Sequence, residues 1–149
     1  MITLIRTTSD NPGFQMLTAL FDEYLVDIDG EEKDFFAQYN QIHLKNVVVC
    51  YENDNAIGCG AFKTYESEVA EIKRMFVHPE QRGKKVASQV LNELELWAKE
   101  LLFATCILET SFKLENAIAL YKKSGYTIIE RYGQYKNVES SVCMKKILK

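Results

Sequence analysis

Apolar residues near the start of the chain recur at steps of three and four, as on one buried face of an α-helix. A short strand over residues 2–6 and the turn Asn11-Pro12-Gly13 precede this run, and Asp29-Gly30 ends it. A second, shorter helix is predicted over residues 33–40. The apolar face of the first helix comprises Phe14, Leu17, Leu20, Phe21, Tyr24, Leu25 and Ile28.

The middle of the chain has the composition of strands. Residues 47–51 and 57–65 are runs of β-branched and aromatic side chains, joined by Glu52-Asn53-Asp54-Asn55-Ala56, which is typical of a hairpin turn. A third strand begins near Glu68. Because consecutive strands usually pair with one another, residues 47–78 are predicted to form three antiparallel strands.

Helices and strands alternate in the last part of the chain. The pattern predicts a helix over residues 84–101, and a strand, a helix and a strand follow it before a final strand. Ser124-Gly125 separates the second helix from the strand after it. The sheet is therefore expected to be mixed, with the final strand pairing with the preceding one across a loop. The predicted ranges are 105–110, 114–123, 126–130 and 142–147, and the loop covers 131–140.

Composition predicts one globular domain over residues 1–149. Hydrophobic residues make up 47% of the chain and charged residues 26%. The net charge of −3 argues against a general nucleic-acid binder, whose surface is usually basic. The sequence has neither a run of about 18 apolar residues nor a basic-then-apolar start, so we expect no membrane span, no signal peptide and a cytoplasmic location.

The cysteines and histidines do not have the spacing of a metal site. The four cysteines form no C-x-x-C pair, and they lie mostly in apolar, strand-like runs, which indicates reduced core residues. His43 and His78 are far from each other and from any cysteine at ligand spacing. No metal is expected. The cysteines are Cys50, Cys59, Cys106 and Cys143.

A basic, glycine-containing loop joins a predicted strand to the helix that begins near residue 84. Arg82, Lys84 and Lys85 supply positive charge beside a helix start, where unpaired backbone N–H groups and the helix dipole favour an anion. Gly83 permits backbone conformations that a Cβ hinders. The pattern favours a phosphate-binding loop, and the alternative is an ordinary turn whose basic residues keep it soluble. Gly58-x-Gly60 lacks a third glycine and lies in a predicted strand, so it is not a dinucleotide-binding motif.

Two segments in order carry a family resemblance. EIKRMFVHPEQRGK, from Glu71 to Lys84, resembles the acetyl-CoA segment of the GNAT superfamily of N-acetyltransferases, and NAIALYKKSGY, from Asn116 to Tyr126, resembles the later motif of the same family. The resemblance implies a mixed α/β fold with a mostly antiparallel central sheet of six to seven strands and about four helices. It also implies acetyl-CoA as co-substrate and direct attack by an amine within a ternary complex.

The resemblance assigns cofactor-binding residues. One departure is that Lys85 stands where the loop signature R/Q-x-x-G-x-G/A has glycine. Lysine can retain a helical N–H group for the pyrophosphate, so we expect weakened rather than lost binding. The assigned residues are Met75, Phe76, Val77, Arg82, Gly83, Lys84, Lys85, Val86, Ala87, Ser88 and Asn116.

Acyl transfer requires a base for the amine and a proton for the departing thiolate. The resemblance assigns Glu71 as general base and Tyr121 as general acid, with Glu109 as the reserve base. Strand alternation predicts that Glu71 shares a face with Met75. An ordinary phenol pKa of about 10 suits a thiol leaving group. The alternatives are an ion pair for Glu71 and a core position for Tyr121.

The amine acceptor is a small molecule or a peptide, and the sequence leaves its identity and homodimer formation open. An acidic cluster in the resembling family's acceptor region would attract a cationic amine, although such runs are commonly solvated helix faces. Tyr132 and Tyr135 are expected to line the other side. A catalytically silent acyl-CoA-binding module and an interaction domain remain alternative functions. The acidic residues are Asp22, Glu23, Asp27, Asp29, Glu31, Glu32 and Asp34.

Overall fold

The computed structural model describes residues 1–29 and 43–149, with the backbone alone for 27–29. The helix predicted over 33–40 lies outside the described residues, as do Glu31, Glu32 and Asp34 of the acidic cluster. The chain divides into two compact units, Met1–Lys63 with Lys73–Leu94 and Thr64–Ile72 with Glu95–Lys149. Strands β3 and β4 each contribute residues to both units.

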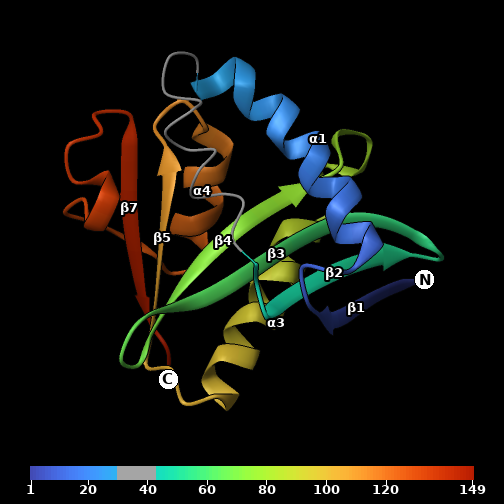
Figure 1. Cartoon of the computed structure of the whole chain (residues 1–149), viewed down its shortest axis with the longest axis horizontal. Coiled ribbons are helices and arrows are strands. Elements are labelled where there is room, and N and C mark those ends of the chain that lie inside the picture. Colours follow the sequence, from blue (N-terminus) through green and yellow to red (C-terminus); the bar gives the residue numbers. More distant parts are fainter. Residues whose placement is uncertain (30–42) are drawn as a thin grey trace. The chain divides into compact units, whose positions relative to one another are not determined.

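Seven strands form a mixed, mostly antiparallel sheet in the order β1-β2-β3-β4-β5-β7-β6 (Figure 1). The strands are β1 (Ile2–Thr7), β2 (Asn46–Glu52), β3 (Asn55–Glu66), β4 (Val69–Val77), β5 (Thr105–Ser111), β6 (Thr127–Ile129) and β7 (Ser141–Ile147). The α-helices of the described residues are α1 (Pro12–Asp29), α3 (Val86–Glu100) and α4 (Glu115–Lys123). Two 3-10 turns, η2 (Pro79–Gln81) and η3 (Gly133–Tyr135), follow β4 and β6.

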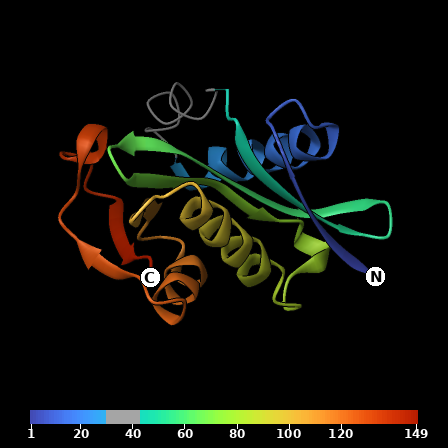
Figure 2. The same ribbon diagram turned by 90° about the horizontal axis from the view of Figure 1, so that it is seen from below.

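In the first unit, side chains alternate between the two faces of β2 and β3, and a helix lies on each face (Figure 2). One face packs on α1. The core there consists of Phe14, Leu17, Leu44, Val47, Val49, Cys59, Ala61 and Phe76, with Leu20 and Phe21 packed against it. Phe14 and Leu17 confirm the apolar face predicted for the first helix, whereas Tyr24 is 38% exposed.

The opposite face of β3 carries glycines where α3 lies closest. A Cβ on Gly60 would come within 2.4 Å of Met75 Sδ and 2.8 Å of Leu94 Cδ1. A Cβ on Gly58 would come within 2.5 Å of Val86 Cγ1. The two glycines therefore provide room for α3 against the strand, and they are not part of a nucleotide-binding loop.

Asn53 and Arg74, two non-glycine residues of the first unit, have a left-handed backbone. Asn53 has a φ of 58°, which suits the tight turn between β2 and β3, and the predicted hairpin is confirmed. Arg74 has a φ of 58° in the middle of β4. A left-handed non-glycine residue inside a strand is uncommon, and it interrupts the regular alternation of the side chains.

The second unit contains the parallel part of the sheet. Val69 to Ile72 of β4 run parallel to β5, and β7 pairs antiparallel with both β5 and β6. The expected pairing of the final strand with the preceding one is confirmed. Gly125, with a φ of 100°, follows the end of α4, as the predicted break requires. Tyr126 Oη and Lys146 Nζ both donate to Glu95, at 2.9 and 2.7 Å.

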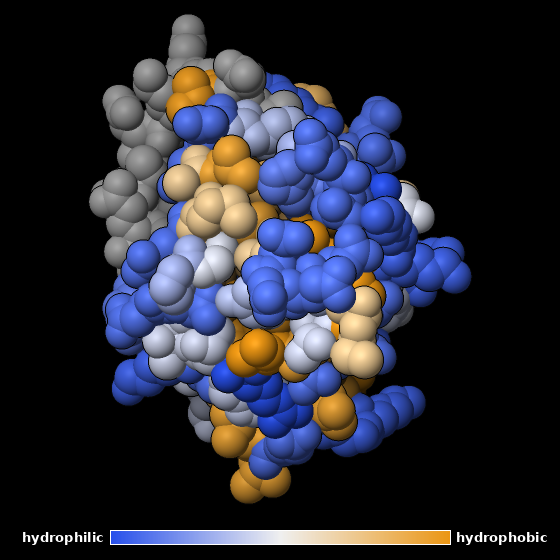
Figure 3. Space-filling model, turned by 90° about the vertical axis from the view of Figure 1, so that its right-hand side faces the viewer, coloured by the Kyte–Doolittle hydropathy of each residue, from blue (hydrophilic) through white to orange (hydrophobic). Residues whose placement is uncertain are grey.

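The predicted helix start at residue 84 was wrong. Helix α3 begins at Val86, because Lys85 has a φ of 63° and lies before the helical residues. The carbonyl of Lys85 accepts the first helical bond, from the N–H of Gln89 at 3.1 Å. On the face seen in Figure 3, hydrophilic side chains predominate and hydrophobic ones form small separate groups.

Candidate active site

The expected base, Glu71, is a buried carboxylate in the second unit. It lies in β4 with 2% of its surface exposed. Tyr132, the residue before η3, donates a hydrogen bond from Oη to Glu71 Oε2 at 2.6 Å. A short bond to an ionised acceptor is among the stronger hydrogen bonds in proteins. The pKa of Tyr132 is raised, first by burial and then by the charge of Glu71, so its phenol remains protonated.

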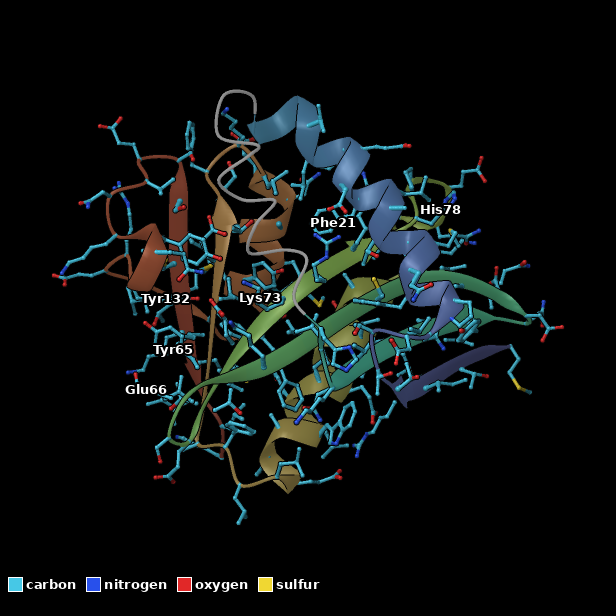
Figure 4. All side chains as sticks on the ribbon, in the orientation of Figure 1. Phe21, Tyr65, Glu66, Lys73, His78 and Tyr132 are labelled. Atoms are coloured by element: carbon cyan, nitrogen blue, oxygen red, sulfur yellow. The ribbon has the colours of Figure 1, made fainter. Side chains whose placement is uncertain are left out.

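Aromatic packing holds the Tyr132 ring. Its centroid lies 5.1 Å from that of Tyr65, with an interplanar angle of 73°, and the two residues lie beside each other in Figure 4. On another side, the Tyr135 ring is 5.7 Å away at 88°. Both arrangements are the edge-to-face geometry that aromatic pairs prefer. Tyr65 and the donation from Tyr132 to Glu71 were not predicted, because nothing local in the sequence indicates them.

The second carboxylate, Glu109, accepts a hydrogen bond from Ser141 Oγ at 2.6 Å. Tyr135 is buried, and its pKa is raised by burial and then by the charges of Glu109 and Glu71. The second unit thus groups the expected base and the reserve base around tyrosines of the β6–β7 connection.

Tyr121, the expected acid, is 7% exposed on α4, and its ring meets that of Tyr126 at 5.9 Å and 65°. Burial, followed by the charge of Glu109, raises its pKa above the ordinary value. The expected match between an ordinary phenol and a thiol leaving group therefore does not hold. The phenol stays protonated over the physiological range and suits hydrogen-bond donation to a developing negative charge.

In the first unit, the basic loop after β4 is tied to its own strand and to α1. Arg82 donates from Nε to the carbonyl of Val77 at 3.2 Å, and its guanidinium lies 5.6 Å from the Tyr24 ring and 5.7 Å from the Phe76 ring. His78, seen at the end of β4 in Figure 4, accepts from the N–H of Glu80 at 3.2 Å and caps η2.

The remainder of the loop contains two residues with a left-handed backbone, Gly83 and Lys85. Gly83 has a φ of 87°, with no atom within 4 Å of a Cβ built on it, and Lys84 donates to Gln81 Oε1 at 2.8 Å. Lys85 has the left-handed conformation that favours glycine, at the position where the family motif has glycine. Its N–H group was expected to lie within the helix, but it precedes the helix. Val86, Ala87 and Ser88 form the first turn, whose N–H groups have no intrahelical acceptor in any α-helix.

The other expected cofactor residues lie in the two units separately. Met75 and Val77 are half-buried on β4, and Phe76 is buried, with its ring stacked on Phe21 at 5.0 Å. Asn116 is exposed in the first turn of α4. The left-handed backbone at Arg74 lies between Glu71 and Met75, so strand alternation no longer supports placing those two on one face.

Arg74 is a buried cation to which the sequence pattern assigned no role. Its Nη2 donates to Asp22 Oδ1 at 2.8 Å and to the carbonyl of Thr18 at 3.1 Å, and its guanidinium lies 5.0 Å from the Phe21 ring. Asp22 therefore pairs within the first unit, and Glu23 beside it is exposed. Asp27 and Asp29 belong to α1. The only local signal for Arg74 is a basic residue within a mostly apolar strand.

The four cysteines are buried and free of disulfides. Among residues 1–29 and 43–149 no group of three or more histidine, cysteine or acidic side chains could hold a metal ion. The same described part of the chain has no helix that is both long and apolar enough to cross a membrane.

Fold and sequence comparisons agree on the class of protein. The family model of the acetyltransferase (GNAT) family matches residues 14–126. A Klebsiella pneumoniae protein assigned as an acyl-CoA N-acyltransferase has a crystal structure with a TM-score of 0.84 and 27% identity, covering 100% of this chain and 99% of that one. The chain belongs to the GNAT acetyltransferase family and is an acyltransferase.

Two further relatives are close in length. The IAA acetyltransferase of Azospirillum brasilense is 27% identical over 150 residues, covering 99% of this chain and 98% of the relative. The GNAT family acetyltransferase from Elizabethkingia anophelis, solved with acetyl-CoA bound, has a TM-score of 0.73 at 20% identity, covering 99% and 98%. The expected mixed sheet of six to seven strands is confirmed.

Proposed function

We propose that this protein transfers an acetyl group from acetyl-CoA to a primary amine by direct attack in a ternary complex. Glu71 acts as general base and Tyr121 as general acid. The observation that carries the proposal is a buried carboxylate, Glu71, in the same unit as Tyr121, a buried phenol that stays protonated. Acyl transfer needs one group of each kind.

Acetyl-CoA suits the loop of the first unit. Arg82, Lys84 and Lys85 provide positive charge beside the first turn of α3, and the open space over Gly83 allows close approach of a phosphate. Relatives of the same fold bind the same group: the Elizabethkingia anophelis structure holds acetyl-CoA, and the PaiA N-acetyltransferase from Thermoplasma acidophilum holds coenzyme A. Met75, Phe76 and Val77 would hold the pantetheine arm through their backbone, and Asn116 would hold the cofactor from α4.

The reaction assigns each proton. Glu71 accepts one proton from the acceptor ammonium, and the neutral amine attacks the thioester carbonyl. The C–S bond breaks as Tyr121 donates its proton to the departing sulfur, and the second proton that the attacking nitrogen loses on becoming an amide restores the Tyr121 phenol. The raised pKa of Tyr121 keeps this donor protonated throughout the usual assay range. The acceptor is a small-molecule or peptide amine. The Azospirillum brasilense relative, named as an IAA acetyltransferase, supports a small-molecule acceptor.

Two variants test these assignments. Tyr121→Phe is expected to lower kcat by about 10²-fold with little loss of acetyl-CoA affinity, since general acid catalysis contributes roughly 10² to 10⁴. Lys84→Ala is expected mainly to weaken CoA binding in calorimetry, because it removes a charge beside the loop. Equal effects of both variants on kcat and on affinity would count against the assignment.

One observation favours a second function, that of a catalytically silent acyl-CoA-binding module. Lys85 has a left-handed backbone at the motif glycine, which is a strained conformation for a residue with a Cβ. Thiol release from acetyl-CoA with a panel of amines separates the two functions. A protein that binds acetyl-CoA but releases no CoA thiol with any amine would support the silent module.

A further inference from the structure

The proposed base, Glu71, is almost inaccessible to solvent, with 2% of its surface exposed. An amine that gives up a proton must transfer it to an atom it can reach. Tyr132 is half-buried, and its Oη lies 2.6 Å from Glu71 Oε2. One hydrogen-bond partner of the buried base is therefore a half-buried phenol.

Local structure fixes this phenol in place. Tyr132 immediately precedes η3, and Gly133, which follows it, has a φ of 52°. The rings of Tyr65 and Tyr135 pack edge-to-face on the Tyr132 ring, so the phenol has little freedom to swing away from the carboxylate. A phenol oxygen that donates its own proton can still accept another hydrogen bond. An ammonium N–H group is a suitable donor.

We propose that Tyr132 relays the acceptor's proton to Glu71, an inference that rests on the proposed function and extends it. One N–H bond of the acceptor ammonium breaks as its proton moves to Tyr132 Oη, while the phenolic proton moves to Glu71 Oε2. The products are a neutral amine, an intact phenol and a protonated carboxyl group. After acetyl transfer, the proton returns through the phenol to water.

The electrostatics of Tyr132 make the two transfers concerted. Its pKa is raised by burial and by the charge of Glu71, so a free phenolate would be unfavourable beside the carboxylate. The phenol therefore accepts the ammonium proton at the same time as it donates its own proton to Glu71. The group that fits this site is a primary ammonium with an N–H bond directed at Oη.

Tyr132→Phe tests the relay, because it keeps the ring and removes the hydroxyl group. With acetyl-CoA and the best amine from a panel, kcat/KM for the amine is expected to fall by about 10²-fold, while the affinity for CoA stays the same. The solvent deuterium effect on kcat/KM should also change. Tyr51→Phe is the control, since it removes a tyrosine hydroxyl that donates to Asn11 Oδ1 at 3.2 Å in the first unit, which contains none of the residues assigned to proton transfer. Its kcat/KM should stay within about twofold of the parent.

Glu71→Gln separates this inference from the proposed function. If Glu71→Gln retains activity, the proposed base fails. If Glu71→Gln is inactive while Tyr132→Phe keeps its rate and pH profile, only the relay is overturned. A faster Tyr132→Phe enzyme would also overturn the relay, since it would show that the hydroxyl blocks the carboxylate.

A second variant covers the case in which Tyr132→Phe does not fold, as judged by circular dichroism. Site-specific 3-fluorotyrosine at position 132 keeps the hydroxyl and lowers the pKa of the phenol, because fluorine withdraws electrons from the ring. The relay predicts a displaced pH profile of kcat/KM with this variant. An unchanged profile would overturn it, because a phenol that only packs would not influence the proton transfer.

Discussion

Arg74 Nη2 lies 2.8 Å from Asp22 Oδ1, and the two partners differ greatly in burial. The Arg74 side chain is 4% exposed, whereas that of Asp22 is 55% exposed. The pair therefore joins α1 to β4 where the strand has its left-handed residue. A guanidinium placed this deeply depends on its acceptors, which are Asp22 and the carbonyl of Thr18.

Asp22→Ala is expected to lower the free energy of unfolding by about 1 to 2 kcal/mol, since it leaves a buried guanidinium with one fewer acceptor. The exposure of Asp22 keeps the effect below that of a fully buried pair. Urea denaturation would measure it. Glu23→Ala, at the exposed neighbouring position, is the control and should change stability by less than about 0.5 kcal/mol. Equal losses for the two variants would contradict this role of Asp22.

Lys85→Gly is expected to stabilise the protein by up to about 1 kcal/mol. A non-glycine residue at a φ of 63° carries strain that glycine lacks, although glycine adds entropy to the unfolded chain. For a chain of this size the gain corresponds to a rise in Tm of roughly 2 to 4 °C. Lys84→Gly removes the same charge without relieving left-handed strain. A thermal melt in which Lys84→Gly matched or exceeded Lys85→Gly would show that strain at 85 is unimportant.

Gly60→Ala is expected to destabilise the protein by about 1 to 3 kcal/mol, because the added methyl group would meet Met75 Sδ and Leu94 Cδ1. Met75 is flexible, so Met75→Ala in the same chain should recover part of the loss. Chemical denaturation of both single variants and the double variant gives the coupling energy. Strictly additive losses would mean that the methyl group and Met75 do not compete for space.

Stability is expected to fall as the pH rises above about 9. Burial raises the pKa of Cys59 and of Cys106 to about 12 and that of Cys143 to about 11, from an ordinary value of 9.0. Above pH 9 the unfolded chain loses these protons while the folded chain keeps them, so each proton lost favours unfolding. The stabilising contribution is full below pH 9 and disappears as the pH passes 11 to 12.

Urea midpoints between pH 7 and pH 11 would measure this dependence. For each variant, stability at high pH is compared with stability at pH 7. Cys59→Ala should lose less stability than the parent between pH 9 and pH 11, because one of the three thiols no longer titrates. If Cys59→Ala loses as much stability above pH 9 as the parent does, the loss must come from other groups, such as the buried tyrosines.

The sequence predicted those features that depend on local patterns. The three-and-four spacing located Phe14 and Leu17 in the core, and the polar run between two β-branched segments located the β2–β3 hairpin. Family motifs identified the loop before α3. Each of these signals lies within one short segment, where periodicity and turn chemistry act directly.

Features that depend on distant or unusual residues were not predicted. A positive φ at Arg74 or Lys85 has no local signal, because residues with a Cβ rarely adopt it and surrounding structure must impose it. The bond between Tyr132 and Glu71 joins positions 61 residues apart. The buried environment that raises the pKa of Tyr121 likewise forms only after folding. The pKa of an ordinary phenol was therefore the wrong expectation for this residue.

The strand order has a consequence for folding. Strand β7 lies between β5 and β6, although the ribosome makes it after both. Until residues 141–147 pair, the edges of β5 and β6 that face β7 lack the strand that joins them. A chain in that state exposes two open strand edges, which is the kind of surface that other copies can pair with.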